Sequence, residues 1–199
     1  MTDLRDCTAL RFHPRCYYRG DEADLADTAR DAWPALIAAT TDATGAITGV
    51  HRTWLDLSET AKAPVSTPRR SMGLINGHGV RIGKVDGVVA IGEGLETMLS
   101  LRVALPTMPV IAAGSANHLD ALLLPDGLHQ AGRRATASMI ARAATVGIEA
   151  MRLTPALGDF NDDLWQLGSE ALHAALRVQL APEDVERFWM PAQESVRAA

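Results

Sequence analysis

The chain has 199 residues, of which 47% are hydrophobic and 22% charged, with a formal net charge of −5, a composition typical of a globular protein of one or two domains. No apolar run approaches the ~20 residues of a membrane span, and the polar first six residues are not a secretory signal. The two cysteines, Cys7 and Cys16, lack the partners of a zinc site, so we expect free thiols in a cytoplasmic protein without membrane contact.

Residues 1–84 suggest a small β-containing module. Apolar stretches at residues 35–40 and 47–55 flank an Asp/Gly turn, which predicts a hairpin. Residues 56–80 are rich in Ser, Thr, Pro, Gly and Arg, which indicates a long loop with short strands near residues 62–65 and 79–82. Loops of that length are uncommon unless they bind something.

Basic residues concentrate in residues 51–84, where six Lys and Arg face only two acidic residues and His51 and His78 lie beside them. The candidates for phosphate contact in this segment are Arg52, Lys62, Arg69 and Arg70. The alternative is a solvated loop face, which charge alone does not separate from a binding surface. Bases could stack on the aromatic residues Tyr17, Tyr18, Trp33 and Trp54, although core packing or cross-strand contact is favoured for Trp54.

Strand and helix patterns alternate after residue 85, which predicts an α/β arrangement with a parallel sheet. We expect strands at residues 88–91, 109–113 and 148–153. The expected helices cover residues 95–105, a segment ending near residue 124, an Ala-rich stretch at 131–146, and stretches beginning at 159 and after 169. No apolar run separates the helices near residues 124 and 131, so the sheet is expected to be one strand short. A three-stranded sheet has little core, and an N-terminal strand or a second chain would complete it.

The stretch at residues 88–97 organises the rest of the chain. An apolar run, β-branched-rich, leads into Gly92-Glu93-Gly94, and a helical pattern follows. Glu93 would therefore lie at the carboxyl end of a parallel strand, where open α/β sheets bind their ligands. Taken alone, a glutamate at this position is more typical of a solvated turn or a helix-start acid than of a functional site.

The segment Gly92-Glu93-Gly94-Leu95-Glu96-Thr97 resembles the first motif of Toprim domains, the catalytic module of bacterial primases, topoisomerases and related nucleases. Residues 10–14, 49–55 and 62–64 look like the N-terminal part of primase-like Toprim proteins of phages, plasmids and mobile elements. Residues 158–162 look like their C-terminal acidic motif. The likeness spans about residues 8–170.

This resemblance implies an α/β fold with a reduced parallel Toprim-like (Rossmann-like) sheet, flanking helices and a small N-terminal β-containing module. The implied division is residues 1–84, a degenerate Toprim domain at 85–180, and a terminal segment at 181–199. By resemblance, Glu93 is the general acid or base, and Asp159 and Asp162 are ligands for Mg²⁺ or Mn²⁺, which would neutralise charge on a reacting phosphate. Glu96 and Asn161 are expected to support the site.

The chain departs from the family in one place. The family's Asp-x-Asp strand should lie just before Ala131 and is absent from the sequence, and Asp126 would be only a partial substitute. Three hypotheses follow: a primase-like protein of DNA replication with Mg²⁺-dependent nucleotidyl or phosphoryl transfer, an inactive Toprim remnant that binds DNA, RNA or a partner protein, and a partner-binding protein without nucleic-acid contact. The resemblance leaves open a homodimer or a replication partner.

Overall fold

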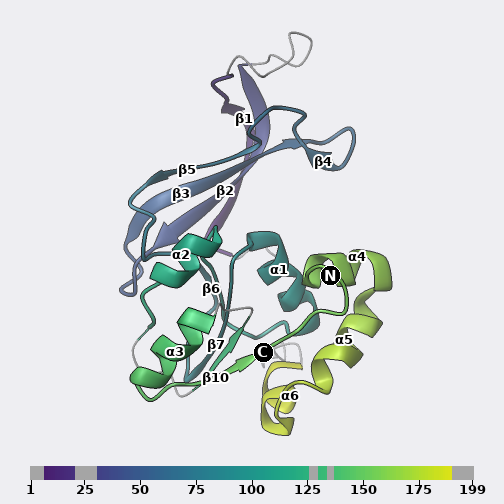
Figure 1. Cartoon of the computed structure of the whole chain (residues 1–199). Helices are drawn as coiled ribbons and strands as arrows, with labels where there is room; N and C mark the ends of the chain where they lie inside the picture. Colours follow the sequence, from purple (N-terminus) through teal and green to yellow (C-terminus); the bar gives the residue numbers. More distant parts are fainter. Residues whose placement is uncertain (1–6, 21–30, 126–129, 134–136, 190–199) are drawn as a thin grey trace, which may run out of the picture.

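The computed structural model describes residues 7–20, 31–125, 130–133 and 137–189. In this part of the chain there are two five-stranded sheets and six helices. Figure 1 shows the N-terminal sheet standing above the second sheet, whose two faces carry the helices. The expected α/β class with an N-terminal β module is therefore confirmed.

The N-terminal sheet is antiparallel throughout. Its strands run in the order β1-β2-β3-β4, and β5 also pairs with β3. Their bounds are β1 (Leu10–Tyr17), β2 (Ala32–Thr41), β3 (Ile47–Asp56), β4 (Ala61–Lys62) and β5 (Arg69–Gly73). The predicted hairpin is confirmed as β2 and β3, and its turn is held by Asp42, which accepts from the N–H groups of Thr44 and Ala46. The long loop predicted after it is interrupted by β5, which the sequence pattern did not indicate.

The second sheet has the order β10-β9-β7-β8-β6, and all neighbours are parallel except β6, which runs antiparallel to β8. The strands are β6 (Val80–Ile82), β7 (Val88–Gly92), β8 (Val110–Ala112), β9 (Gln130–Arg133) and β10 (Glu149–Arg152). The prediction of a missing strand is wrong, because β9 lies between β7 and β10. The Ala-rich helix predicted from residue 131 is shorter than expected and begins only at Ala137. Completion of the sheet by a strand from the N-terminal part is confirmed by β6.

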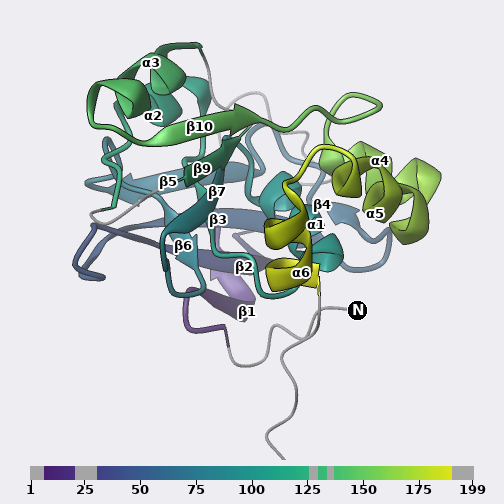
Figure 2. The ribbon, with the colours of Figure 1, turned by 90° about the horizontal axis from the view of Figure 1, so that it is seen from below.

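Helices cover both faces of the second sheet (Figures 1 and 2). One face packs against α2 (Ala116–Ala121) and α3 (Ala137–Thr145), and the other against α1 (Leu95–Ala104), α4 (Phe160–Leu167), α5 (Ser169–Arg177) and α6 (Pro182–Trp189). Side chains of β7 alternate between them: Val89 and Ile91 join the core under α2 and α3, and Ala90 joins the core under α1. An apolar run buried on both faces is what this packing requires.

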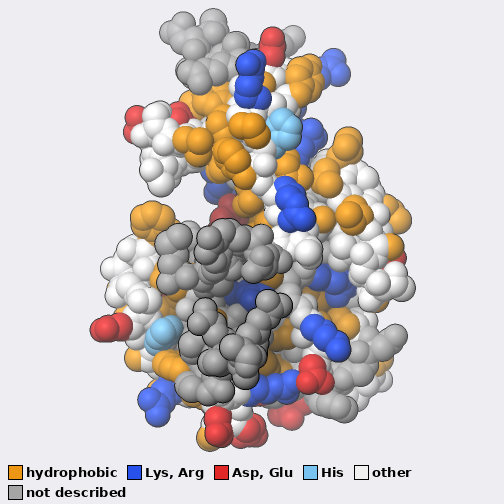
Figure 3. All heavy atoms as spheres, turned by 180° about the vertical axis from the view of Figure 1, so that it is seen from behind, with side chains coloured by type: hydrophobic (Ala, Val, Ile, Leu, Met, Phe, Trp, Pro, Cys, Tyr) orange, Lys and Arg blue, Asp and Glu red, His pale blue; other side chains and the backbone are white. Residues whose placement is uncertain are grey.

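The two sheets share one core and are joined directly. Leu10 and Ala38 of the N-terminal sheet lie in the same buried cluster as Val80 and the apolar side of α1. A backbone bridge between Thr41 and Gly79 links the two parts. Seen from behind in Figure 3, an indentation separates the N-terminal sheet from the rest of the molecule on one side. Among the described helices, none is long and apolar enough to cross a membrane.

Candidate functional site

Glu93 lies at the carboxyl edge of the second sheet, directly after β7. A Cβ at Gly92 would come within 2.5 Å of the Met98 Cε atom, so the glycine leaves room for this side chain of α1 beside the strand. The carbonyl of Glu93 accepts from the N–H of Gly114 at 2.8 Å, so the loops after β7 and β8 are tied together. The Glu93 side chain is exposed, and no side chain among the described residues donates a hydrogen bond to it. The carboxylate therefore stands open to the space above the sheet edge.

That space is a cleft between the sheet edge and the inner face of the N-terminal sheet. It holds two adjoining cavities of about 320 and 290 Å³, and Arg69, Glu93 and Glu96 line both of them. Lys62, Asp159 and Asn161 line the smaller cavity. Arg70 lines the larger cavity, so the structure brings together seven of the residues singled out in the sequence, from both parts of the chain. Their chemical roles remain predictions.

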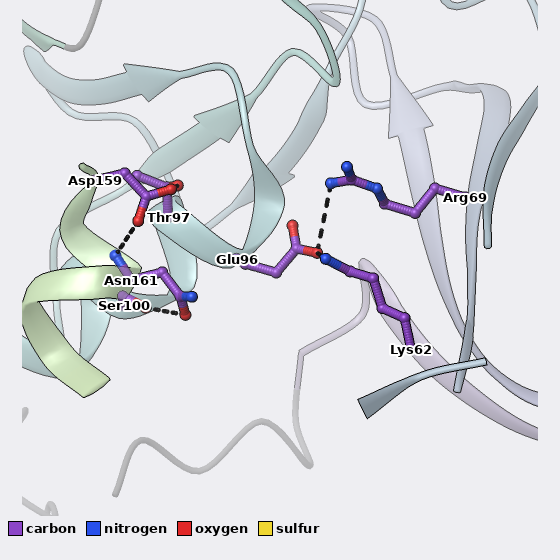
Figure 4. A network of polar contacts seen from close by, with 7 residues as sticks. All are labelled: Lys62, Arg69, Glu96, Thr97, Ser100, Asp159 and Asn161. Atoms are coloured by element: carbon purple, nitrogen blue, oxygen red, sulfur yellow. Dashed lines mark hydrogen bonds and ion pairs between the residues drawn. The ribbon is translucent and has the colours of Figure 1, made fainter. Parts of the chain in front are cut away.

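An ion-paired cluster crosses the cleft, as Figure 4 shows. Oε1 of Glu96, in the first turn of α1, lies 3.3 Å from Nζ of Lys62 and 3.7 Å from Nη1 of Arg69. Burial raises the pKa of Glu96, but the hydrogen bond from its own backbone and the positive charges of Lys62 and Arg69 outweigh burial, so the net shift is downward. Glu96 is therefore a carboxylate at neutral pH and compensates the two cations that face it.

Strand register divides the four basic candidates into two pairs. Lys62 lies opposite Leu55 and Arg69 opposite Thr53, while Arg52 and Arg70 lie opposite each other. Because side chains alternate between the two faces of a strand, Lys62 and Arg69 share one face and Arg52 and Arg70 the other. Only the first pair reaches the Glu96 carboxylate.

Arg52 and Arg70 pack instead on an aromatic cluster on the outer face. The Arg70 guanidinium lies 4.6 Å from the Tyr18 ring centroid and 5.9 Å from that of Trp54. It also donates to the Tyr18 hydroxyl at 3.0 Å and to the carbonyl of Arg19 at 2.7 Å. Arg52 lies 5.0 Å from the Trp54 centroid. These contacts stabilise the N-terminal sheet and direct both guanidinium groups away from Glu96.

Three of the four aromatic residues considered for base stacking are buried. Tyr18, Trp33 and Trp54 retain 2%, 3% and 1% of their exposure and form a core with Ala35. The expectation that Trp54 packs in the core is confirmed. Tyr17, by contrast, is 64% exposed.

His51 is a cleft residue to which the sequence assigned no role of its own. It lines the larger cavity, and its Nδ1 lies 2.9 Å from the Ser71 hydroxyl. Burial lowers the pKa of His51, Glu96 opposes that shift and Arg69 adds to it, and the net shift is downward. The signal that identifies it is alternation in β3, because His51 shares a face with Thr53.

Asp159 caps helix α4 and joins it to α1. Its Oδ1 accepts from the backbone N–H groups of Asn161 at 2.8 Å and Asp162 at 2.9 Å, and its Oδ2 accepts from the Thr97 hydroxyl at 2.8 Å. A second contact, 3.2 Å between the Ser100 hydroxyl and Oδ1 of Asn161, joins the same two helices (Figure 4). Both carboxylate oxygens of Asp159 therefore already accept hydrogen bonds within the protein.

The other acidic candidates contribute less to the cleft. Asp162 is half-buried, and its side chain has no hydrogen bond to a described residue. Asp163, which the sequence did not single out, is buried and accepts from the N–H groups of Ala156 and Leu157, so it fixes the loop before α4. Asp126 lies outside the described residues.

The described residues do not fit a magnesium or manganese site. Mg²⁺ is held by carboxylates in near-ideal octahedral geometry, together with water and substrate phosphate. Here Asp159 is engaged in the helix cap and Glu96 in ion pairs, which leaves Glu93 as the one open carboxylate lining the smaller cavity. No group of three His, Cys, Asp or Glu suited to a metal ion occurs in the part of the chain that the structure describes.

Comparison with family models divides the chain much as its sheets do. Residues 88–170 match the model described as Toprim domain, and they include β7, the Glu93 turn, α1 and α4. Residues 88–170 form a Toprim domain. Residues 1–82 match a model described as a domain of unknown function (DUF7146). Comparison with curated proteins finds no match.

The fold resembles that of DNA primases. The primase fragment of the bacteriophage T7 primase-helicase is 13% identical over 74% of this chain and 64% of that fragment, with a TM-score of 0.51. A primase domain from Pseudomonas aeruginosa gives 14% identity over 88% and 67% of the two chains with a TM-score of 0.48. The Aquifex aeolicus primase is 16% identical over 73% of this chain and 40% of that chain, with a TM-score of 0.46. At these identities the likeness concerns the fold alone, and the chain spans less than two thirds of the T7 fragment.

The strand that the sequence was expected to lack is present as β9, but its exit lacks acids. β9 lies beside β7 with Arg133 opposite Ile91, so Arg133 is at the carboxyl edge on the strand next to Glu93. The sequence there is Gly132-Arg133-Arg134, without the Asp-x-Asp pair that the resemblance implies. The departure found in the sequence therefore concerns the acids and not the strand.

Proposed function

We propose that this chain is a primase-like Toprim protein that binds nucleic acid, DNA or RNA, by its phosphate backbone. The cleft between the two sheets is the binding site, and Lys62 and Arg69 are the phosphate contacts. Nucleotidyl transfer by a metal ion held on the described residues is not part of this proposal. The protein corresponds to the second of the three hypotheses drawn from the sequence.

The observation that carries the proposal is the position of two cations over a Toprim sheet edge. Lys62 and Arg69 come from different strands of the N-terminal sheet and converge on the same carboxylate oxygen of Glu96. They are 43% and 51% exposed as side chains, so a phosphate from solvent can reach them. Phosphate neutralisation by Lys and Arg is the main source of nucleic-acid affinity, and Arg adds a planar fork of donors.

Fluorescence anisotropy of a labelled oligodeoxythymidylate, titrated at several salt concentrations, tests this function. We expect each of Lys62→Gln and Arg69→Gln to weaken binding and to lower the slope of log affinity against log salt by about 0.7, the value for one phosphate contact on a single strand. Arg177→Gln, at the exposed end of α5, is the matched control for lost charge. Equal losses in Arg69→Gln and Arg177→Gln would contradict the proposal.

One observation favours a second candidate, which is catalysis centred on Glu93. Its carboxylate is exposed at the exit of β7 and lines both cavities, as a general acid or base must be to meet a substrate. Primer synthesis and strand cleavage assays with Mg²⁺ or Mn²⁺ distinguish the two functions. Activity that is lost in Glu93→Gln would favour the enzyme, whereas no activity in a protein that binds the oligonucleotide would favour the binding module.

A further inference from the structure

The contacts between Glu96 and its two cations, Lys62 and Arg69, are longer than good hydrogen bonds. A single oxygen, Oε1, faces both Lys62 at 3.3 Å and Arg69 at 3.7 Å. Charge-assisted hydrogen bonds of ammonium and guanidinium groups to carboxylates are about 2.7–2.9 Å long, so both contacts are longer than that optimum. Oε1 is also enclosed, and neither cation meets it in a well-aligned hydrogen bond. The single charge of Glu96 thus offsets one of the two positive charges, and neither cation is well paired with it.

A phosphodiester would satisfy the same two cations better than Glu96 does. It presents two non-bridging oxygens, so that each cation would have an oxygen of its own, and the guanidinium fork of Arg69 suits a phosphate bidentately. All three side chains line the smaller cavity, which is open to solvent. A phosphate entering there meets the Glu96 carboxylate as a like charge next to the groups that it needs.

We propose that Glu96 is an internal competitor for nucleic-acid phosphate. In the free protein its carboxylate occupies the position between Lys62 and Arg69, and on binding a backbone phosphate takes its place. This inference rests on the proposed function and adds how that site is regulated. Because the ion pairs join α1 to β4 and β5, binding also exchanges a contact between the two parts of the protein for contacts to the ligand.

If Glu96 competes with phosphate, removing its charge should increase the affinity for nucleic acid. Removing the partner of a buried charge usually weakens a protein instead. Exposed ion pairs contribute about 0.2–1 kcal/mol each, so releasing the two held by Glu96 should tighten binding about two- to thirtyfold. We expect this gain in Glu96→Gln, measured by anisotropy with the labelled oligodeoxythymidylate at fixed salt. Glu96→Asp keeps the charge but shortens the side chain, and we expect a smaller gain from it.

The control for net charge is Glu186→Gln. Glu186 is exposed on α6, the helix whose Arg187 binds Asp86 before β7, at the opposite edge of the sheet from the cleft. The Glu186→Gln substitution removes one negative charge, as Glu96→Gln does, but leaves the surroundings of Lys62 and Arg69 unchanged. A double variant, Glu96→Gln with Arg69→Gln, tests the mechanism, because the gain measured against Arg69→Gln should be smaller when Lys62 is the one cation left to release. If Glu96→Gln altered binding only through the fold, the change in affinity would be the same with and without Arg69.

The outcomes separate this inference from the function on which it rests. If the wild-type protein binds in an Arg69-dependent way and Glu96→Gln binds no tighter than Glu186→Gln, the competition is refuted and the proposed function stands. If neither the wild-type protein nor Glu96→Gln binds, both are refuted. Binding by Glu96→Gln alone, with its fold verified by circular dichroism, would support both.

Discussion

Replacing Asp159 by Ala is the sharpest test of whether this acid is a structural clamp or a metal ligand. The change removes the acceptor for three donors: the N–H groups of Asn161 and Asp162 and the hydroxyl of Thr97. Thr97 is buried, with 7% of its surface exposed, so its hydroxyl would lose a partner that solvent replaces poorly. A clamp therefore predicts a loss of stability from Asp159→Ala in the absence of any metal.

The expected magnitude follows from these contacts. Loss of an N-cap costs about 0.5–2 kcal/mol, and loss of a hydrogen bond to a charged acceptor about 1.5–3 kcal/mol. Because one carboxylate makes both contacts, we expect about 2–4 kcal/mol for Asp159→Ala. For a chain of this length that corresponds to a fall in Tm of about 5–15 °C. Asp159→Asn keeps a good cap residue and should cost about 1 kcal/mol.

The stability of Asp159→Ala is measured by thermal and urea unfolding followed by circular dichroism, each with EDTA and with Mg²⁺. The control is Asp162→Ala, in the same helical turn but without a side-chain hydrogen bond to a described residue, and we expect less than about 1 kcal/mol from it. Equal stability of Asp159→Ala and Asp162→Ala would refute the clamp. A Tm that Mg²⁺ raises in the wild-type protein but not in Asp159→Ala would identify Asp159 as a metal ligand.

Three further predictions concern the cleft and its support. The pKa of His51 is lowered from its usual 6.5, so below pH 6.5 the unfolded chain binds a proton that the folded protein does not. Stability should therefore fall as pH drops from about 6.5 through the folded pKa, and unfolding of His51→Gln at several pH values should show a flatter dependence. Arg70→Ala should lower the free energy of unfolding by about 1–3 kcal/mol, since it loses its hydrogen bonds and ring contacts, while the anisotropy titration stays unchanged. Ser115 accepts from the N–H of His118 as the cap of α2, so Ser115→Ala should cost about 1 kcal/mol in the same unfolding assay.

The best-predicted part of the fold is the unit around Glu93. Its apolar run is buried on both faces, its glycines form the turn, and α1 begins at Leu95 as the spacing indicates. These features are local, because period, glycine and helix start all act within about ten residues. The hairpin of β2 and β3 was predictable for the same reason.

Strand β9 was not predictable because its local sequence favours a different structure. The residues Gln130–Arg133 hold two poor strand formers, Ala and Gly, and continue into an Ala-rich stretch that favours a helix. What makes them a strand is their place between β7 and β10, where both neighbours offer unpaired backbone groups. A buried backbone donor or acceptor needs a partner, and this requirement outweighs a propensity difference of about 1 kcal/mol or less per residue.

A count of basic residues in the sequence does not tell on which face of the sheet each side chain lies. Four basic residues of the same segment looked equivalent in the sequence, yet two pair with Glu96 and two pack on aromatic rings. The difference depends on strand register. A shift of one residue in the pairing of β3 with β5 would exchange the faces on which Arg69 and Arg70 lie. That register is anchored by the aromatic core, since Trp54 packs on Tyr18 and both outer guanidinium groups contact its ring. The buried aromatic residues are therefore not accessible for base stacking, but their packing determines which cations face Glu96.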